Sequence, residues 1–373
     1  MGDVLSFNDK PMAPSEVYFL DYSKGYDILE GIKRLFREAG FGRVLKGKVA
    51  VKVHIGEMGN TTYLRPVFVR VALEALKEIG CDAFITETTT LYPKRRFTPE
   101  GCYEVAQLHG FTEKLGAPFI VADGEGQGVK VKVDRQVEGC ELGEVEVAPA
   151  IAKADSLLLL VHAKGHLLAG FGGALKHLAM GCVTKASKAA QHAACGLKFN
   201  AELCNGCGKC VEACPFDALR LEDGRPMRDL AKCMHCNSCM FACPNGAWSW
   251  PEEGKAGFQV YLAHAAYAVA NFFRGRLAVL SFVQDVTPLC DCATPAGRPL
   301  VPDVGVLASL DPVATDAAAL DLIDVAASVT WHSARPPNFL SKVNGVDPKS
   351  HLRVAERLGV GSTLYRLITL EWR

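Results

Sequence analysis

The chain has 373 residues, of which 49% are hydrophobic and 22% charged. This composition excludes an intrinsically disordered chain, and the length exceeds what one hydrophobic core usually serves, so we expect more than one domain. The 41 basic and 41 acidic residues cancel, which argues against nucleic acid as a partner. The strongest apolar run, Leu157 to Val161, is too short to cross a bilayer, and Met1 to Glu16 lacks a secretion-signal layout. We therefore predict a cytoplasmic protein without membrane contact.

Short apolar strands alternate with helical patterns through the first half of the chain. Residues 48–53 are predicted to form a strand, and residues 66–79 a helix, because Pro66 suits a first turn and apolar residues recur on one face. Similar patterns predict strands at 83–86, 119–122, 157–161 and 277–283, and helices at 260–273 and from Pro312, with Asp311 as N-cap, to about Ala327. This order predicts an α/β fold with a mostly parallel, doubly wound sheet.

Ionisable side chains follow five of these predicted strands. Open α/β sheets bind ligands beyond the carboxyl ends of their strands, where the strand order reverses, so we expect a polar crevice at that edge. The residues concerned are His54, Glu57, Glu87, Asp123, His162, Lys164, His166 and Asp285. Among them, His54, His162, Lys164 and His166 are candidates for acid or base catalysis. Loops are polar in every protein, so the alternative is that individual members only serve their loops.

A glycine-rich segment, residues 162–182, follows the strand at 157–161. Its glycines would let backbone N–H groups approach an anion, and a short helix is predicted directly after them, with Lys164 and Lys176 beside its N-terminus. The segment is neither a Walker A loop nor a Rossmann fingerprint, and residues 123–128 are predicted to form a turn. Close helix–sheet packing is the alternative role for these glycines. The candidate ligands of an anionic small molecule are Glu57, Glu87, Asp123, Gly170, Gly172, Gly173, Lys176 and His177.

Two runs of four cysteines follow each other at an offset of 29 residues, each with the spacing Cys-x2-Cys-x2-Cys-x3-Cys-Pro. This is the pattern of bacterial two-cluster ferredoxins, in which the fourth cysteine of each run ligates the other cluster. We therefore expect two [4Fe–4S] clusters. The first is assigned to Cys204, Cys207, Cys210 and Cys243, and the second to Cys233, Cys236, Cys239 and Cys214. A zinc ribbon and a disulfide framework are the alternatives, and both match this spacing less well.

Strand and helix patterns continue after residue 250, so the cysteine-rich segment is predicted to be an insertion. The expected parts are an α/β domain in two pieces, residues 1–198 and 251–373, and a ferredoxin-like α+β domain at residues 199–250. Residues 185–198 and 251–257 are predicted to be the leading and trailing linkers.

Three further cysteines fall near the predicted crevice. Cys182 ends the glycine-rich segment, and Cys290 and Cys292 follow the strand at 277–283. These three thiols suggest a third metal site or a redox thiol, and ordinary buried thiols are the alternative. A further metal and a flavin both stay open for the crevice.

Several segments together resemble one protein family along nearly the whole chain. They are 54–60 (HIGEMGN), 87–92 (ETTTLY), 162–166 (HAKGH), 170–176 (GFGGALK), 180–182 (MGC), 290–292 (CDC) and 308–316 (ASLDPVATD). With these motifs the chain resembles the DUF362 family, in its form with an inserted two-cluster 4Fe–4S module. The resemblance implies an architecture and an iron–sulfur protein, and it implies no substrate.

Three functions are compatible with these features. The first is an oxidoreductase whose clusters relay electrons from a redox partner protein to an anionic small molecule in the crevice. The second is a ferredoxin-like electron carrier whose α/β domain docks redox partners. The third is a maturation factor in which the clusters are structural. We rank them in this order.

Overall fold

The computed structural model describes residues 14–25, 27–330 and 338–371. Residues 1–13, which make up most of the range 1–16 where no secretion signal is predicted, lie outside the described residues. An eight-stranded mixed sheet forms the centre, in the order β16-β1-β15-β14-β7-β2-β3-β4. Its strands are β1 (Ser15–Asp21), β2 (Lys48–Val53), β3 (Asp82–Glu87), β4 (Phe119–Val121), β7 (Ser156–His162), β14 (Leu277–Val283), β15 (Gly305–Ser309) and β16 (Tyr365–Thr369). Of these eight strands, only β15 runs antiparallel to its neighbours, so the predicted mostly parallel α/β sheet is confirmed.

The order of the parallel strands reverses between β2 and β7. From β2 the chain continues to β3 and β4 on one side, whereas β7 is followed in the sheet by β14 on the other. Val53 pairs with Leu160, so the carboxyl ends of the two strands lie side by side. His54 follows β2 and His162 ends β7. The fold therefore brings these two histidines to the point where open sheets bind ligands.

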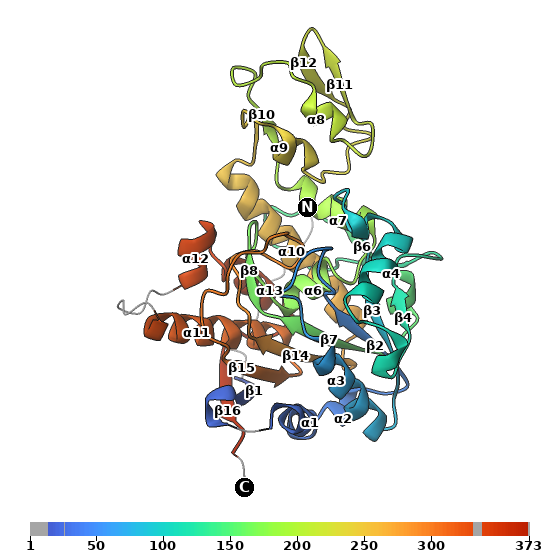
Figure 1. Cartoon of the computed structure of the whole chain (residues 1–373), viewed down its shortest axis with the longest axis vertical. Helices are drawn as coiled ribbons and strands as arrows, with labels where there is room; N and C mark the ends of the chain where they lie inside the picture. The colour runs from blue at the N-terminus through green and yellow to red at the C-terminus, as the bar shows by residue number, and fades with distance from the viewer. Residues whose placement is uncertain (1–13, 26, 331–337, 372–373) are drawn as a thin grey trace.

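Helices cover both faces of the sheet (Figure 1). Strand β7 is fully buried, and its side chains alternate between two apolar layers. One layer lies against α1 (Ile28–Glu38) and α3 (Pro66–Glu78), and the other against α6 (Ala174–Ala179), α10 (Glu252–Phe272), α11 (Pro312–Thr330) and α13 (Ser350–Leu358). Asp311 caps α11 as predicted, because its Oδ1 accepts the backbone N–H groups of Val313 and Ala314 at 2.8 and 3.0 Å.

The two predicted linkers are wrong because both are largely helical. Helix α7 (Lys185–Ala193) occupies most of the leading one, and Gln191 on it donates to the carbonyl of Ala179 at 2.7 Å. Helix α10 already begins at Glu252, directly after Pro251. Glu252 and Glu253 in its first turn suit the positive end of the helix dipole, so this start had a signal in the sequence.

The cysteine-rich segment pairs its strands only with one another in the described part of the chain. Strand β10 (Lys198–Phe199) pairs with β13 (Trp248–Ser249), and β11 (Leu219–Glu222) with β12 (Arg225–Arg228). Helices α8 (Lys209–Glu212) and α9 (Ser238–Ala242) complete it, around an apolar cluster of its own. Figure 1 shows the segment at one end of the molecule, with β11 and β12 farthest from the sheet. The domain boundaries at 198/199 and 250/251 stay a prediction.

The remaining elements are short or peripheral. They are α2 (Phe41–Val44), α4 (Pro99–Leu108), α5 (Pro149–Ala152), α12 (Phe339–Asn344), β5 (Val129–Lys132), β6 (Glu144–Val147), β8 (Lys164–His166) and β9 (Gly170–Gly172). No helix in the described ranges combines the length and apolar character that a membrane span requires.

Candidate functional site

Two cavities in the cysteine-rich segment divide its eight cysteines into the two predicted sets. One cavity is lined by Cys204, Cys207, Cys210 and Cys243 together with Trp248. The other is lined by Cys214, Cys233, Cys236 and Cys239. In each cavity, three cysteines come from one run and the fourth from the other run. The crossed grouping is therefore the geometry of the fold, and ligation of iron by these thiolates stays a prediction.

The chemistry of both cavities suits a cluster better than a single zinc ion. All fifteen cysteines are free thiols. No three of the eight sulfurs lie within 4.8 Å of one another among the described residues, whereas tetrahedral zinc with bonds of about 2.3 Å requires sulfurs roughly 4 Å apart. Backbone N–H groups of Gly206, Ala218 and Ala247 donate to cysteine sulfurs at 3.3–3.4 Å. Such hydrogen bonds stabilise cluster thiolates.

The two cysteine loops repeat the same backbone with different residues. Gly206 and Gly208 have φ values of 73° and 74° in the first loop, and the equivalent His235 and Asn237 have φ values of 52° and 64° in the second. Glycine takes this left-handed conformation without strain, and asparagine tolerates it. Asn237 is only 4% exposed, so its side chain has a role that glycine in the first loop cannot have.

Asn237 joins the second loop to the α/β part. Its Nδ2 lies 3.3 Å from Nδ1 of His192 on α7, and its Oδ1 accepts the Nε1–H of Trp250 at 3.2 Å. Phe216, which lines the second cavity, contacts Phe97 across the same junction with ring centroids 5.9 Å apart. The second cavity therefore faces the sheet domain, and the first is the outer one.

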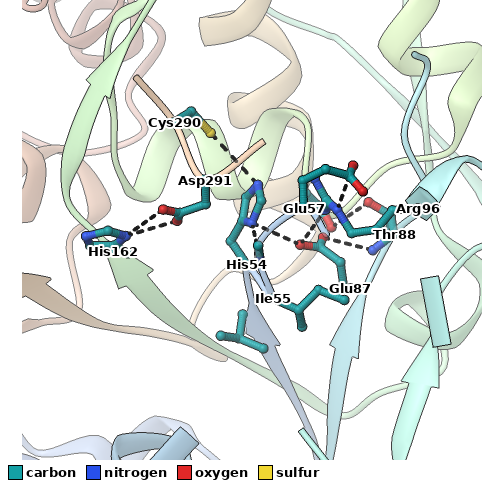
Figure 2. A network of polar contacts seen from close by, with 12 residues as sticks. His54, Ile55, Glu57, Glu87, Thr88, Arg96, His162, Cys290 and Asp291 are labelled. Atoms are coloured by element: carbon teal, nitrogen blue, oxygen red, sulfur yellow. Dashed lines mark hydrogen bonds and ion pairs between the residues drawn. The ribbon is translucent and has the colours of Figure 1, made fainter. Parts of the chain in front are cut away.

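A buried charge network follows strands β2 and β3 at the edge of the sheet (Figure 2). Lys52 Nζ lies 2.8 Å from Glu87 Oε1, and Arg96 lies 3.3 Å from Glu57 and 3.5 Å from Glu87. All four side chains are at most 4% exposed. Two cations and two carboxylates balance one another here, so Glu57 and Glu87 hold Arg96 and Lys52 in place, and their predicted role as ligands of a small molecule stays a prediction.

His54 links this network to the thiols. Its Nδ1 accepts the backbone N–H of Gly56 at 3.0 Å, and its Nε2 lies 3.8 Å from the sulfur of Cys290. Burial, followed by the charge of Arg96, lowers the pKa of His54 well below its usual value. The ring is therefore neutral, with its proton on Nε2, and points an N–H group at Cys290 as Figure 2 shows.

Asp291 is the centre of a second buried charge cluster. His162 Nδ1 lies 2.9 Å and Lys164 Nζ 2.8 Å from its Oδ2. The Nε2 of His162 also faces the carbonyl oxygen of Gln284, at 2.8 Å. A carboxylate and a carbonyl are both acceptors, so each ring nitrogen of His162 faces an acceptor. Burial opposes ionisation of Asp291, but His162 and Lys164 lower its pKa to about 2. His162 and Lys164 thus hold Asp291 in place, and their predicted role in acid or base catalysis stays a prediction.

The predicted third cysteine site has a different membership. His166, Cys290 and Cys292 have ligand atoms that all lie within 4.8 Å of one another, and Cys182 does not belong to this group among the described residues. Cys182 is instead fully buried, and burial raises the pKa of its thiol to about 12. It ends the turn after α6, away from the loop that carries Cys290. The prediction of Cys182 as a member of this site is therefore wrong.

The N-terminus of α6 is not open to an anion. The carboxylate of Asp316 accepts the backbone N–H groups of Ala174 and Leu175 at 2.6 and 3.0 Å. A Cβ atom on Gly173 would overlap Oδ1 of Asp316, so glycine is required there for this contact. The predicted anion site at the helix start is wrong because the chain supplies its own carboxylate. Gly170 and Gly172 belong to the strand that precedes the helix.

Lys176 and His177, on the same helix, differ from the other candidates because their side chains are unpaired. Lys176 makes no ion pair or side-chain hydrogen bond in the described ranges. Neither ring nitrogen of His177 has a hydrogen-bond partner, although the residue is only 5% exposed. Burial, followed by Lys52, lowers the pKa of His177 well below its usual value. A neutral imidazole with a free donor and acceptor can bind a polar ligand, and so can an unpaired ammonium.

Two predicted crevice residues serve other purposes. Asp123 accepts the N–H and the hydroxyl of Thr89 at 2.8 and 2.7 Å and faces Lys188 at 3.8 Å, so it fixes the loop after β3. Residues 123–128 form the predicted turn. Asp285 pairs with Arg65 at 2.7 Å near the surface and is not part of the buried clusters.

Sequence reasoning missed four residues that organise the site: Lys52, Arg96, Asp291 and Asp316. Lys52 had a signal, because a lysine inside the apolar run at 48–53 must find a partner when buried. Asp291 and Asp316 lie inside the family motifs at 290–292 and 308–316, but these motifs do not indicate which residues the two carboxylates contact. Arg96 lies in a single-turn 3-10 helix, Arg95–Phe97, that no sequence pattern predicted.

Comparisons with known proteins give two kinds of similarity. A 79-residue alignment is 37% identical to one subunit of the Na(+)-translocating ferredoxin:NAD(+) oxidoreductase complex of Acetobacterium woodii, and covers 21% of each chain. A 38-residue alignment is 50% identical to an uncharacterized ferredoxin of Methanocaldococcus jannaschii, covering 10% of this chain and 25% of that protein. A 49-residue alignment is 39% identical to the formate dehydrogenase iron-sulfur subunit of Wolinella succinogenes, covering 13% and 24%. The chain thus spans a quarter or less of each of these relatives, and their names support an iron–sulfur, ferredoxin-like module in the chain.

Solved structures resemble the chain more distantly. The lactate racemase apoprotein of Thermoanaerobacterium thermosaccharolyticum aligns with a TM-score of 0.34 and 12% identity, over 72% of this chain and 50% of that one. A Thermotoga maritima protein aligns with a TM-score of 0.40 and 12% identity, over 82% and 58%.

The family comparison covers most of the chain. The model described as "Domain of unknown function (DUF362)" matches residues 49–321. This range contains the whole cysteine-rich segment and every charged residue of the two buried clusters. The predicted resemblance is thereby confirmed, and the protein belongs to the DUF362 family.

Proposed function

We propose that this protein is an iron–sulfur oxidoreductase in which two [4Fe–4S] clusters relay electrons from a redox partner to a site in the α/β domain. The observation that supports it most is the pair of cavities, each lined by one crossed set of four cysteines. Cys204, Cys207, Cys210 and Cys243 would hold the outer cluster, and Cys214, Cys233, Cys236 and Cys239 the inner one. When bound, the clusters supply one-electron transfer; the protein supplies their ligands, hydrogen bonds to sulfur and exclusion of water.

The position of the two cavities supports a direction for this relay. Cys207 of the outer set is exposed, and apolar side chains lie exposed around the same segment: Leu203, Leu221, Met227, Leu230 and Phe241. A redox partner would dock on this outer surface. The inner cavity contacts α7 through Asn237 and His192, so electrons would leave the inner cluster toward the sheet edge.

The receiving site in this proposal is the sheet edge beside α6. Lys52, Lys164 and Arg96 are already neutralised by carboxylates. Lys176 is the cation left unpaired among the described residues of this edge, so an anionic small molecule would bind beside it and hydrogen-bond to His177. His54 and His166 would face the same ligand and exchange protons with it.

Double variants of the cysteines test the crossed ligation. Anaerobically purified wild type should contain about eight irons and eight sulfides per chain. Cys204→Ala with Cys243→Ala should retain about four irons, because both residues belong to one cluster. Cys204→Ala with Cys214→Ala should retain almost none, because each cluster then lacks a ligand. The reverse result would show that each run ligates its own cluster, and near-zero iron in wild type would refute the proposal.

The electron carrier is the second candidate, and the exposed apolar side chains of the cysteine-rich segment favour it equally. It differs in one respect, because the buried groups of the sheet edge would then have no part in electron flow. Reoxidation of reduced holoprotein by an anionic acceptor separates the two, because Lys176→Ala should slow it in an oxidoreductase and leave it unchanged in a carrier.

A further inference from the structure

Cys290 and Cys292 bring two sulfurs together at the carboxyl edge of the sheet. Both sulfurs and a ring nitrogen of His166 lie within 4.8 Å of one another, and each thiol shifts the pKa of the other, that of Cys290 down and that of Cys292 up. The intervening Asp291 is fully buried and held by His162 and Lys164. The backbone between the two cysteines is therefore fixed, and the sulfurs need only approach to the length of a disulfide bond, about 2 Å.

The groups around these sulfurs are donors and cations, which suit thiolates. His54 accepts a backbone N–H at Nδ1, so its neutral ring carries its proton on Nε2, 3.8 Å from Cys290. His166 accepts the backbone N–H groups of Leu168 and Ala169 at Nδ1, at 3.2 and 3.1 Å. Burial, followed by Lys176, lowers the pKa of His166 well below its usual value, so this ring is also neutral and protonated on Nε2.

This tautomer argues against a metal ion at the same place. Histidine ligates a metal through an unprotonated nitrogen. In His166 the nitrogen without a proton is already occupied by two backbone amides, and the other carries a proton. The arrangement of His54, His166, Lys164 and Lys176 thus stabilises negative charge on sulfur, whereas a cation in their midst would be repelled.

The same surroundings set Cys290 apart from the other buried cysteines. The neighbouring Cys292 is the largest cause that lowers the pKa of Cys290, to about 6, and Lys164 and Lys176 act in the same direction, while burial opposes them. Burial instead raises the pKa of Cys102 and Cys195 to about 12. The pKa of Cys292 is raised well above its usual value, with Cys290 as the first cause. A thiolate beside a protonated thiol is the state from which a disulfide forms and to which it is reduced.

The inner cysteine cavity is the one of the two that adjoins the α/β part. Asn237 of the second cysteine loop contacts His192 on α7. Burial, followed by the charge of Lys176, lowers the pKa of His192 to about 3. The charge of Lys176 also lowers the pKa of Cys290. Lys176 therefore lies within electrostatic range of both the junction and the thiols.

We infer that Cys290 and Cys292 form a redox-active dithiol that exchanges two electrons with the two clusters. The inference rests on the proposed function, because it requires two clusters. In the reducing direction, each reduced cluster gives one electron, the sulfur–sulfur bond between Cys290 and Cys292 breaks, and two protons from water yield two thiols. Two one-electron centres thus match one two-electron acceptor, and electrons and protons balance.

Counting electrons tests the inference. Anaerobic holoprotein is oxidised with a small-molecule disulfide, desalted and titrated with dithionite while cluster absorbance is followed. Wild type should accept about four electrons per chain, two for the clusters and two for the disulfide. Cys292→Ser should accept about two at unchanged iron content. Cys81→Ala removes a buried thiol at the opposite edge of the sheet and should still accept about four.

Mass-spectrometric thiol mapping of oxidised wild type keeps the test independent of how the variants fold. The peptide with Cys290 and Cys292 should be alkylated only after reduction. An uptake of about two electrons by wild type with full iron, or free thiols at both positions after oxidation, would overturn the dithiol and leave the clusters standing. Wild type without iron would instead overturn the proposed function itself.

Discussion

Asp316 offers a pH-dependent test of how α6 is held in place. Its carboxylate is fully buried and accepts two backbone N–H groups, yet no cation faces it in the hydrogen bonds and ion pairs described. Burial outweighs these hydrogen bonds and raises the pKa of Asp316 from 3.8 to about 7. Because the folded state holds this proton more tightly than the unfolded state, the stability that it contributes is present below about pH 4 and is lost as pH rises through about 7.

The magnitude follows from the shift. About three pKa units at about 1.36 kcal/mol each correspond to a loss of up to about 4 kcal/mol between pH 4 and pH 8. Asp316→Asn keeps one acceptor oxygen and cannot ionise, so it removes this loss while weakening one hydrogen bond, which costs about 1 kcal/mol. The variant should therefore be less stable than wild type near pH 5 and more stable near pH 8.

Anaerobic denaturant unfolding at intervals between pH 4.5 and pH 8 measures this difference. The free energy of unfolding of the variant relative to wild type should rise with pH and change sign within the range. Asp321→Asn is a matched control, since Asp321 lies on the same helix, pairs with Lys349 at 2.7 Å and is 44% exposed; its difference should change little. Parallel curves for Asp316→Asn and wild type would refute the reasoning, because the carboxyl would then titrate alike in both states.

Two further predictions concern the charges of the sheet edge. Glu87→Gln leaves Lys52 buried without its carboxylate and should lower the free energy of unfolding by about 3–5 kcal/mol. The control, Glu78→Gln in the exposed pair with Lys33, should change this free energy by less than about 1 kcal/mol. Equal effects of the two variants in denaturant unfolding would show that the buried pair contributes no more to stability than the exposed one. Lys176→Ala should weaken binding of acetate or inorganic phosphate about tenfold or more in calorimetric titration, since a hydrogen bond to a charged group contributes about 1.5–3 kcal/mol. The control, Lys132→Ala in an exposed strand, should leave the affinity unchanged. Equal affinities of Lys176→Ala and wild type would show that Lys176 does not bind the anion.

The sequence predicted the sheet well because apolar runs have a direct structural meaning. Strand β14 has the predicted bounds, and β2 and β7 differ from the prediction by a residue or less at each end. An apolar run such as Leu157 to Val161 indicates a strand that is buried on both faces. Regularly spaced cysteines indicate that their sulfurs come together at one site. The prediction of linkers at 185–198 and 251–257 was wrong because polar helices and linkers have a similar amino-acid composition.

The site was predicted less completely because the pattern of a sequence places residues at an edge without showing what they contact. His54 and His162 were both expected at the carboxyl edge and both lie there. Only the structure shows that His162 is bound to Asp291 and Gln284 on its two nitrogens. Partners such as Arg96 and Asp316 are far in sequence from the residues that they contact, so no local spacing predicts these contacts.

The duplicated cysteine loops are alike in sequence spacing, but a single exchange of glycine for asparagine makes them unlike in their surroundings. The loop with Gly208 has no side chain with which to attach, whereas the loop with Asn237 is fastened to a neighbouring helix. The two halves of this internal repeat therefore differ in how they contact the α/β part of the chain. Chemically identical cofactors held in such a pair of loops would experience different solvent and hydrogen bonding, so a gradient of reduction potential along the insert is a consequence of this one asymmetry.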